Sequence, residues 1–374
     1  AGPMLLRAAL PTASSIIVTF DEPLSEAGLS AAWFTLSDGI SVNSATLLSP
    51  ATQVLLALSA PLLAGRAYTL SITADAQDCL GNRAAAVMST RIGLAEAMAP
   101  GDLVINELLF NPRTGGQDFL ELYNPSAKIL NLKGLQIQNA QRTTNFSTIF
   151  QSDFLLFPDE YAAVSDDIAN IQAYYNVPDI RTLVQNSLPG FDDESGNASL
   201  LFNGVVIDAY DYSESWHSPL LDTKDGVSLE RIDPSGSSNS AGNWHSAAAA
   251  VGFATPGYRN SQFRSSPSLA DEMISIPNKT FSPDGDGQED VLQIFYTAEK
   301  AGFLLNLRIF DANGRAVRTL LRSELLGSEG VFKWDGANEE GTKARTGIYI
   351  LWIELFHPDG QVERLKKTCV LAGY

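Results

Sequence analysis

The sequence predicts an all-β protein made of three β-sandwich domains in series, with one short helix in the middle domain. Short apolar or β-branched runs recur along the chain, as in Ser15–Phe20, Gln53–Leu58 and Tyr68–Thr73. These runs are separated by Pro, Gly, Ser and Asn, which is typical of the strands and turns of sandwiches. Only one stretch favours a helix strongly, and it is short.

The helical stretch spans residues 166–175. It begins with two aspartates, which suit the positive end of a helix, and Pro178 lies just beyond its end. Helical spacing places Ile168, Ile171 and Tyr175 on one face. We therefore expect a helix that covers one end of a sandwich with this face.

Two changes in composition divide the chain. An Ala-rich stretch with a proline surrounds residues 94–101, and residues 257–271 contain Ser, Arg, Asn and Pro with little apolar periodicity. A length of 374 residues fits two to four domains. The predicted parts are a first domain at 1–97, a second at 101–260, a linker at 261–273 and a third domain at 274–374.

The charge is strongly acidic and uneven. The chain has 25 basic and 43 acidic side chains and a formal net charge of -18. Residues 101–260 contain 8 of the basic and 20 of the acidic side chains. Such a surface repels polyphosphates, which argues against nucleic acid as a partner.

The cysteines and the apolar runs limit the class further. The two cysteines, Cys79 and Cys369, fall in different predicted domains, so we expect buried free thiols and not a disulfide scaffold. No apolar run approaches the length of about 18 residues needed to cross a bilayer. The first residues lack the features of a signal peptide, which we expect to have been removed if it was present.

Residues 281–290 form the strongest candidate site. Four acidic side chains fall within seven residues, and Gly285 and Gly287 between them permit sharp turns. Calcium prefers six to eight oxygen ligands, which such a loop can bring together. The alternative is a solvated acidic turn. We predict a structural Ca²⁺ site whose ligands are Asp284, Asp286, Asp290 and, through its backbone carbonyl, Gln288, with Glu289 a weaker candidate.

The middle domain resembles the bacterial lamin-tail domain. The resemblance rests on several motifs in the same order: Val104–Glu107, Asp118–Pro125, Leu130–Leu135, Gly226–Arg231, Asn243–Trp244 and Ala254–Gly257. It implies an immunoglobulin-like (Ig-like) β-sandwich of the kind that accompanies secreted enzymes and cell-surface proteins. Nuclear lamin tails are associated with DNA through basic surfaces, and the acidity of this copy removes that implication.

The middle domain also contains carboxyl groups that could act as a pair. Glu107 and Glu121 could hold a metal or do acid–base work, or they could brace neighbouring strands and loops by hydrogen bonds. Glu121 and Asn124 flank the apolar Leu122, which suggests that polar groups bond the turn at Asn124–Pro125. The acidic loop 191–197 is a second place for a cation, or simply a solvated loop.

The last domain resembles the Ig-like domain of the flagellar hook-capping protein, in the version found at the C-termini of secreted Bacteroidetes proteins. The matching motifs are Phe281–Gly287, Leu307–Arg315, Trp334–Gly336 and Thr346–Tyr349. They predict a hairpin turn at Asp311–Gly314, a core tryptophan at Trp334 and a closing strand from Tyr349. In that phylum such domains often serve as type IX secretion signals, so the resemblance implies export and surface attachment.

The first domain resembles, less closely, a bacterial Ig-like domain of S-layer type. The residues that carry this resemblance are Ile17–Leu24, Leu62–Leu70 and Asp78–Asn82. The segment Asp78–Asn82 is interpreted as a loop, with a second cation site as the alternative.

Catalytic motifs are missing from the sequence. It has three histidines and no serine-hydrolase elbow, zinc-protease helix, phosphate loop or dinucleotide fingerprint. Trp216–His217 and Trp244–His245 could form a sugar-stacking platform or a metal-ligand pair, although tryptophans in sandwiches are commonly core residues. A hydrolase would need Glu107, Glu121 or His217 to converge in a pocket.

Together, these patterns and resemblances predict a non-catalytic, exported bacterial protein, or the C-terminal part of a larger one. It would act as a structural or adhesive module at the cell surface. The expected partners are a protein or glycan at the surface and the secretion machinery. The alternative is a carbohydrate-binding accessory region of a larger secreted hydrolase, which would expose an aromatic strip made of Tyr210, Tyr212 and Trp216.

Overall fold

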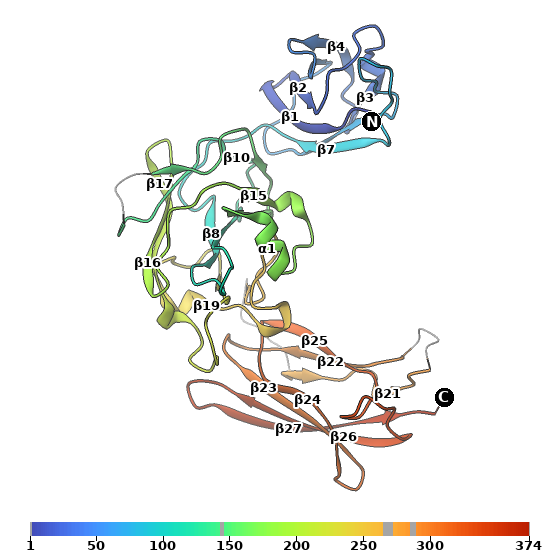
Figure 1. Ribbon diagram of the computed structural model, residues 1–374, viewed down its shortest axis with the longest axis vertical. Helices are drawn as coiled ribbons and strands as arrows, with labels where there is room; N and C mark the ends of the chain where they lie inside the picture. Colours follow the sequence, from blue (N-terminus) through green and yellow to red (C-terminus); the bar gives the residue numbers. More distant parts are fainter. Residues whose placement is uncertain (1, 143–145, 265–271, 285–288, 374) are drawn as a thin grey trace. The chain divides into compact units, whose positions relative to one another are not determined.

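The computed structural model describes residues 2–142, 146–264, 272–284 and 289–373. In these ranges the chain is all-β, with strands in seven sheets and one α-helix, as predicted (Figure 1). It divides into two compact units. The first holds residues 1–103, 124–135 and 150–160, and the second holds the remainder. Because the units cut across the expected boundaries, the division into three domains stays a prediction.

The N-terminal part contains two sheets that share one apolar core. The alternating run Ser15–Phe20 turns Ile16, Val18 and Phe20 inward, and Leu70 and Ile72 of the other sheet join the same cluster. The first sheet contains, in order, β1 (Leu5–Thr12), β2 (Ser15–Phe20), β5 (Gln53–Leu58) and β4 (Val42–Leu48), and the second contains β3 (Phe34–Leu36), β6 (Tyr68–Ile72) and β7 (Met88–Ile92), with the 3-10 turn η1 at Ala31–Trp33. The small pair β10 (Leu130–Asn131) and β13 (Leu155–Leu156) completes the first unit.

The middle part is built on a six-stranded sheet whose order is β15 (Leu183–Gln185), β14 (Tyr161–Ser165), β9 (Phe119–Tyr123), β8 (Val104–Leu109), β18 (Leu229–Arg231) and β19 (Trp244–Ser246). A second sheet holds β12 (Ser147–Thr148), β11 (Gln136–Gln138), β16 (Ser195–Phe202) and β17 (Val205–Ser213). Every residue of the central strands β8 and β9 is buried. Polar groups on these two strands therefore need partners inside the protein.

The single α-helix is α1 (Ile168–Tyr174), slightly shorter than predicted. The side chain of Asp167 caps it by accepting hydrogen bonds from the amides of Ala169 and Asn170. Ile171 and Tyr175 pack into a cluster with residues of β8, β9, β14 and β15. The predicted apolar face therefore does cover this sheet. Short 3-10 turns lie at η2 (Ile180–Thr182), η3 (Glu214–Trp216), η4 (Ala241–Asn243) and η5 (Ala249–Val251).

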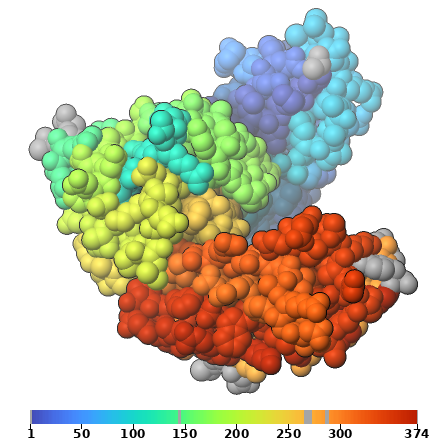
Figure 2. Space-filling model, turned by 60° about the horizontal axis from the view of Figure 1, so that its bottom comes forward, coloured from blue at the N-terminus to red at the C-terminus, as the bar shows by residue number. Residues whose placement is uncertain are grey.

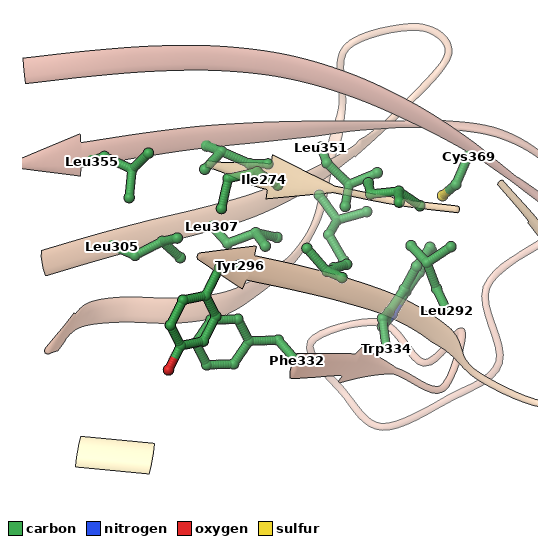
Figure 3. Close-up of a cluster of buried hydrophobic side chains, with 14 of the residues drawn as sticks. Ile274, Leu292, Tyr296, Leu305, Leu307, Phe332, Trp334, Leu351, Leu355 and Cys369 are labelled. Carbon is green, nitrogen blue, oxygen red and sulfur yellow. The ribbon is translucent and has the colours of Figure 1, made fainter. Parts of the chain in front are cut away.

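The C-terminal sandwich, orange to red in Figures 1 and 2, consists of two sheets around one core. One sheet has the order β20 (Ile274–Ser275), β22 (Leu292–Thr297) and β25 (Glu329–Trp334), and the other has β21 (Thr280–Phe281), β27 (Val362–Leu371), β26 (Gly347–Phe356), β23 (Leu304–Asp311) and β24 (Ala316–Leu325). Trp334 is fully buried, and Tyr296 stacks on Phe332 with ring centroids 5.1 Å apart (Figure 3). The core position predicted for Trp334 is confirmed.

Turn chemistry in this sandwich also follows the sequence. Asp311 accepts hydrogen bonds from the amides of Asn313 and Arg315, and Gly314 adopts the positive φ of 79° that the turn requires. Asp335 accepts the amide of Ala337 next to Gly336. The predicted hairpin turn is therefore present, and Asp335 and Gly336 form a second turn after β25.

The expectation of two buried thiols is wrong for one of them. Both cysteines are free, but Cys79 is exposed while Cys369 is buried. Cys79 lies in the predicted Asp78–Asn82 loop, in which Asp78 accepts hydrogen bonds from the amides of Leu80 and Asn82. Because the carboxylate of Asp78 points inward to organise this loop, the neighbouring cysteine faces solvent.

Candidate functional site

Three glutamates form a row across neighbouring strands of the six-stranded sheet. Glu107 of β8 lies directly opposite Glu121 of β9 on one side and Glu230 of β18 on the other. All three side chains are fully buried. We call Glu121, Glu107 and Glu230 the acid row.

The segment of residues 254–262, here called the strap, supplies most of the hydrogen bonds to the acid row. Thr255 donates its amide to Glu107 Oε1 over 2.8 Å, and its hydroxyl lies 2.9 Å from both Glu107 Oε2 and Glu230 Oε1. Ser228, the residue before β18, donates its hydroxyl to Glu107 Oε1. Thr255 thus joins the two carboxyl groups through one hydroxyl.

The far end of the strap binds the other carboxyl oxygens. Ser261 donates its hydroxyl and Gln262 its amide to Glu230 Oε2, each over 2.8 Å. Gly257 donates its amide to Glu121 Oε2 over 2.6 Å. All three members of the acid row therefore hold the strap.

Two asparagines complete the network. Asn106 Nδ2 donates to Glu121 Oε1 over 2.8 Å and to Asn260 Oδ1 over 2.6 Å. Asn260 Nδ2 in turn donates to the backbone carbonyls of Asn106 and Arg231. These bonds fix the orientation of both amides and bind the strap to β8 and β18.

Burial raises the pKa of every member of the acid row. The pKa of Glu107 rises from 4.5 to about 8 because of burial and the nearby charge of Glu230. Burial also raises the pKa of Glu230, and burial together with the charge of Glu107 raises that of Glu121 well above its usual range. Like charges on adjacent strands favour protonated carboxyl groups.

This geometry supports the bracing of neighbouring strands and loops by hydrogen bonds. Among the residues that the structure describes, no group of three His, Cys, Asp or Glu side chains is arranged to hold a metal ion. The carboxyl oxygens are bonded to strap and strand donors. Glu107 and Glu121 do come together, but Glu121 bonds Asn106 and Gly257 and not the turn at Asn124–Pro125. In that turn, Asn124 bonds Ser126, Lys128 and Leu156.

The predicted aromatic strip is not formed. Tyr210 and Tyr212 are buried, and Tyr210 stacks on the buried Trp244 with ring centroids 4.2 Å apart. Trp216 alone remains partly exposed. His217 is buried, with its Nδ1 2.8 Å from the hydroxyl of Ser246, and burial lowers its pKa to about 3. Trp244 is therefore a core residue, and His217 lies apart from the acid row.

The predicted calcium loop is described only in part, because Asp286 and Gln288 lie outside the described residues. Asp284 follows β21, and its amide donates to the carbonyl of Ser282 over 2.8 Å. Ser282 in turn donates its amide to the carbonyl of Glu289 over 2.9 Å, which closes the loop. Asp290 and Glu289 line a hollow of about 300 Å³ with Asn278 and Thr280.

The acidic loop 191–197 is partly ordered by an ion pair. Arg142 binds Asp192 through two nitrogens, and Phe191 is buried. Burial raises the pKa of Asp118 from 3.8 to about 7, and the nearby negative charges of Asp193 and Asp166 add to this increase. The loop is therefore more than a solvated turn, although the cation suggested for it has no described ligand group.

Three family models match separate parts of the chain. The bacterial Ig-like domain matches residues 3–91, the lamin tail domain residues 96–214, and the CHU_C type IX secretion signal domain residues 274–371. The predicted Ig-like, lamin-tail and secretion-signal resemblances are confirmed. The naming of the hook-capping protein is not supported, because the model that matches the C-terminal part is the type IX secretion signal domain.

Solved structures show only distant likeness. The N-terminal part of the bacterial S-layer protein SbsC matches with a TM-score of 0.24 and 11% sequence identity. The match covers 57% of this chain and 44% of that one. Alpha-2-macroglobulin from Escherichia coli matches with a TM-score of 0.22 and 10% sequence identity, over 97% of this chain and 96% of that one. Latent PorU from Porphyromonas gingivalis matches with a TM-score of 0.22 and 11% sequence identity, over 99% of this chain and 33% of that one. Scores this low carry no argument about function. No curated protein matches the chain.

Sequence reasoning missed the third carboxyl group and the strap. Glu230 stands inside the short buried strand Leu229–Arg231, just as Glu107 and Glu121 stand inside theirs. That shared pattern, one glutamate inside a buried strand, was the available signal. The pairing of β18 with β8 joins residues more than a hundred positions apart, so no local pattern could reveal it.

Proposed function

We propose that this protein is an exported, non-catalytic structural module that acts at the bacterial cell surface and is delivered by a type IX secretion system. The observation that carries the proposal is the type IX secretion signal domain matched at residues 274–371, a segment that has its own two sheets and apolar core. The bacterial Ig-like and lamin-tail matches supply further non-catalytic domains upstream of it. In the described ranges no helix is long and apolar enough to cross a membrane.

The role of the C-terminal segment is tested by deleting residues 274–374. We expect the shortened chain to stay in the cell, while the full chain reaches the surface or the medium. A matched control carries Glu340→Gln, an exposed position of the same sandwich. Normal export of the shortened chain would remove the secretion role.

We further propose that Ca²⁺ binds at the 284–290 loop and stabilises the C-terminal sandwich. Asp284 and Asp290 would supply carboxylate oxygens, as would Asp286, and Gln288 would supply its backbone carbonyl. The closed backbone between Ser282 and Glu289 supports this, because it draws the two ends of the acidic stretch together. An ion that binds only the folded state raises the free energy of unfolding.

The calcium proposal predicts a metal-dependent melting temperature. We expect thermal unfolding of the full chain to shift upward with Ca²⁺ and downward with a chelator. An Asp284→Ala, Asp286→Ala double variant should lose this shift, and an Asp222→Ala variant, at an exposed position elsewhere, should keep it. Identical melting curves with and without Ca²⁺ would leave the stretch as an ordinary acidic turn.

An adhesive role would add a surface ligand, either a protein or a glycan. The carbohydrate-binding alternative now depends on Trp216, since Tyr210 and Tyr212 are buried. A glycan that binds there should quench or shift the fluorescence of the wild-type chain, and Trp216→Ala should abolish that change. Equal binding by both chains would place any glycan site elsewhere.

A further inference from the structure

We propose that the strap and the acid row form a proton-dependent latch, closed while Glu107 and Glu230 share a proton and released when that proton leaves. The latch would fasten the last segment of the middle part to its six-stranded sheet and, through it, residues 326–328 of the C-terminal sandwich. The proposal rests on hydrogen-bond counting at Thr255 and on the contacts of the strap, and it is independent of the proposed export.

The shared proton follows from the contacts of one hydroxyl. The hydroxyl of Thr255 has a single proton, yet it lies 2.9 Å from a carboxyl oxygen of Glu107 and 2.9 Å from one of Glu230. It can donate to only one of them. The other oxygen must then carry a proton and donate it to Thr255, or two acceptors would face each other in a fully buried site.

The shared proton should lie on Oε2 of Glu107 or on Oε1 of Glu230, because these are the two carboxyl oxygens that face the hydroxyl of Thr255. The second oxygen of each group already accepts two hydrogen bonds, from Ser228 and Thr255 to Glu107 and from Ser261 and Gln262 to Glu230. Burial raises the pKa of Glu107 to about 8, so the proton is held at neutral pH. Its loss leaves two buried negative charges on adjacent strands with one donor too few.

No cation among the printed partners of these carboxyl groups offsets such a charge. Glu121 of β9 lies beside Glu107, and His245 of β19 lies directly opposite Glu230. Tyr258 of the strap and Tyr175 at the end of α1 also face the row, and burial raises the pKa of both to about 12. The neighbouring titratable groups are thus acidic or neutral near pH 8. The charge of an ionised Glu107 is therefore relieved only when the strap opens and admits water.

The strap passes the effect along the chain within the second compact unit. The carbonyl of Ser261 accepts the amide of Ser328 over 2.7 Å. Gln262 Nε2 donates to the carbonyl of Leu326 over 3.1 Å and to that of Ser246 over 2.9 Å. Leu326 and Ser328 immediately precede β25 of the C-terminal sandwich. Release of the strap would therefore free the bonds at 326–328.

Hydrogen exchange of the full chain between pH 5 and pH 9 tests the latch. After correction for the intrinsic exchange rate, we expect protection at the amides of Thr255, Gly257 and Gln262 to fall by up to about tenfold per pH unit from about pH 4.5 to about pH 8, because the open strap releases the proton that the closed strap holds. Above about pH 8 the protection should level off, since the closed state has then lost the proton as well. The amide of Ser328 should follow. Peptides from β26, which do not contact the strap, should show no such fall.

The decisive variant is Glu107→Gln, which mimics the protonated group. Its amide can donate to Thr255 Oγ1 while its carbonyl accepts from Ser228 and Thr255, so the protection of the strap should stay nearly constant between pH 5 and pH 9. Glu340→Gln, on the surface of the C-terminal sandwich, should behave as wild type. Equal loss of protection in wild type and Glu107→Gln would overturn the proposal.

A measurement on the wild-type chain keeps the proposal testable if Glu107→Gln fails to fold. Infrared spectroscopy detects the carbonyl stretch of a protonated, buried carboxyl group. We expect this band at pH 7 and a partial loss of its intensity as the pH rises through about 8. The buried Glu121, whose pKa also lies well above its usual range, accounts for the intensity that remains. Absence of the band at pH 7, or a band that stays unchanged between pH 7 and pH 10, would contradict the shared proton.

Discussion

Asp208 and Glu107 show two ways in which one fold keeps a carboxyl group away from water. Asp208 of β17 lies 2.8 Å from the guanidinium of the buried Arg231 and also accepts the amide of Ile105. Glu107 has no such cation, and burial raises its pKa to about 8. Both groups tie strands together, the first through an ion pair and the second through a carboxyl group that holds a proton at neutral pH.

Removing Asp208 should be severely destabilising. Asp208→Ala leaves the guanidinium of Arg231 buried, with only the carbonyls of Ile105, Asp233 and Gly236 as partners. Breaking a buried pair in this way costs about 3 to 5 kcal/mol. Chemical denaturation should show this loss, whereas Asp75→Ala, which breaks an exposed pair with Arg83, should cost less than about 1 kcal/mol. A similar small loss in both variants would show that the Asp208 pair is not a structural tie.

Asp118 provides a second pH-dependent group outside the acid row. Its pKa rises from 3.8 to about 7, so the folded state binds more protons than the unfolded chain between these values. Its contribution to stability is complete below about pH 4 and is lost as the pH rises through about 7, by up to about 1.4 kcal/mol per pH unit. Asp118→Asn should remove this part of the pH dependence, measured by denaturation at pH 5 and pH 8. Asp222→Asn, at an exposed position, should leave it intact.

At the scale of elements, alternation and turn residues predicted the strands well. The strands Ser15–Phe20 and Gln53–Leu58 begin and end at the predicted residues. Strands of two residues, such as β20 and β21, carry no pattern of their own and form only because a longer neighbour offers hydrogen bonds. Of the acid row, the sequence indicated Glu107 and Glu121 as a possible pair. Glu230 and the strap residues that bond the row could not be predicted, because they lie far from this pair in the sequence.

The cap of α1 is a local feature that can be tested by one substitution. Asp167→Ala removes the acceptor for the amides of Ala169 and Asn170. We expect a loss of about 0.5 to 2 kcal/mol in the free energy of unfolding. Gln172→Ala, on the exposed face of the same helix, should change stability by less than about 0.5 kcal/mol. Equal effects would show that the carboxylate contributes no capping.

At the scale of the whole molecule, the family matches cover three parts of the chain, and none of the three models is of an enzyme. The acidity predicted from the sequence is concentrated in residues 101–260 and suits a protein that stays soluble outside the cell. The ligand at the surface was beyond prediction, because binding residues on sandwiches lie on variable loops and faces with no fixed spacing. Export is therefore the part of the proposed function that a family match supports directly, through the type IX secretion signal domain at residues 274–371.

The most direct test of that account is cell fractionation of the full chain in a bacterium with an intact type IX secretion system and in a matched strain without it. We predict that the protein appears at the surface or in the medium of the first strain and accumulates inside the second. Equal amounts outside both strains would contradict delivery by this route.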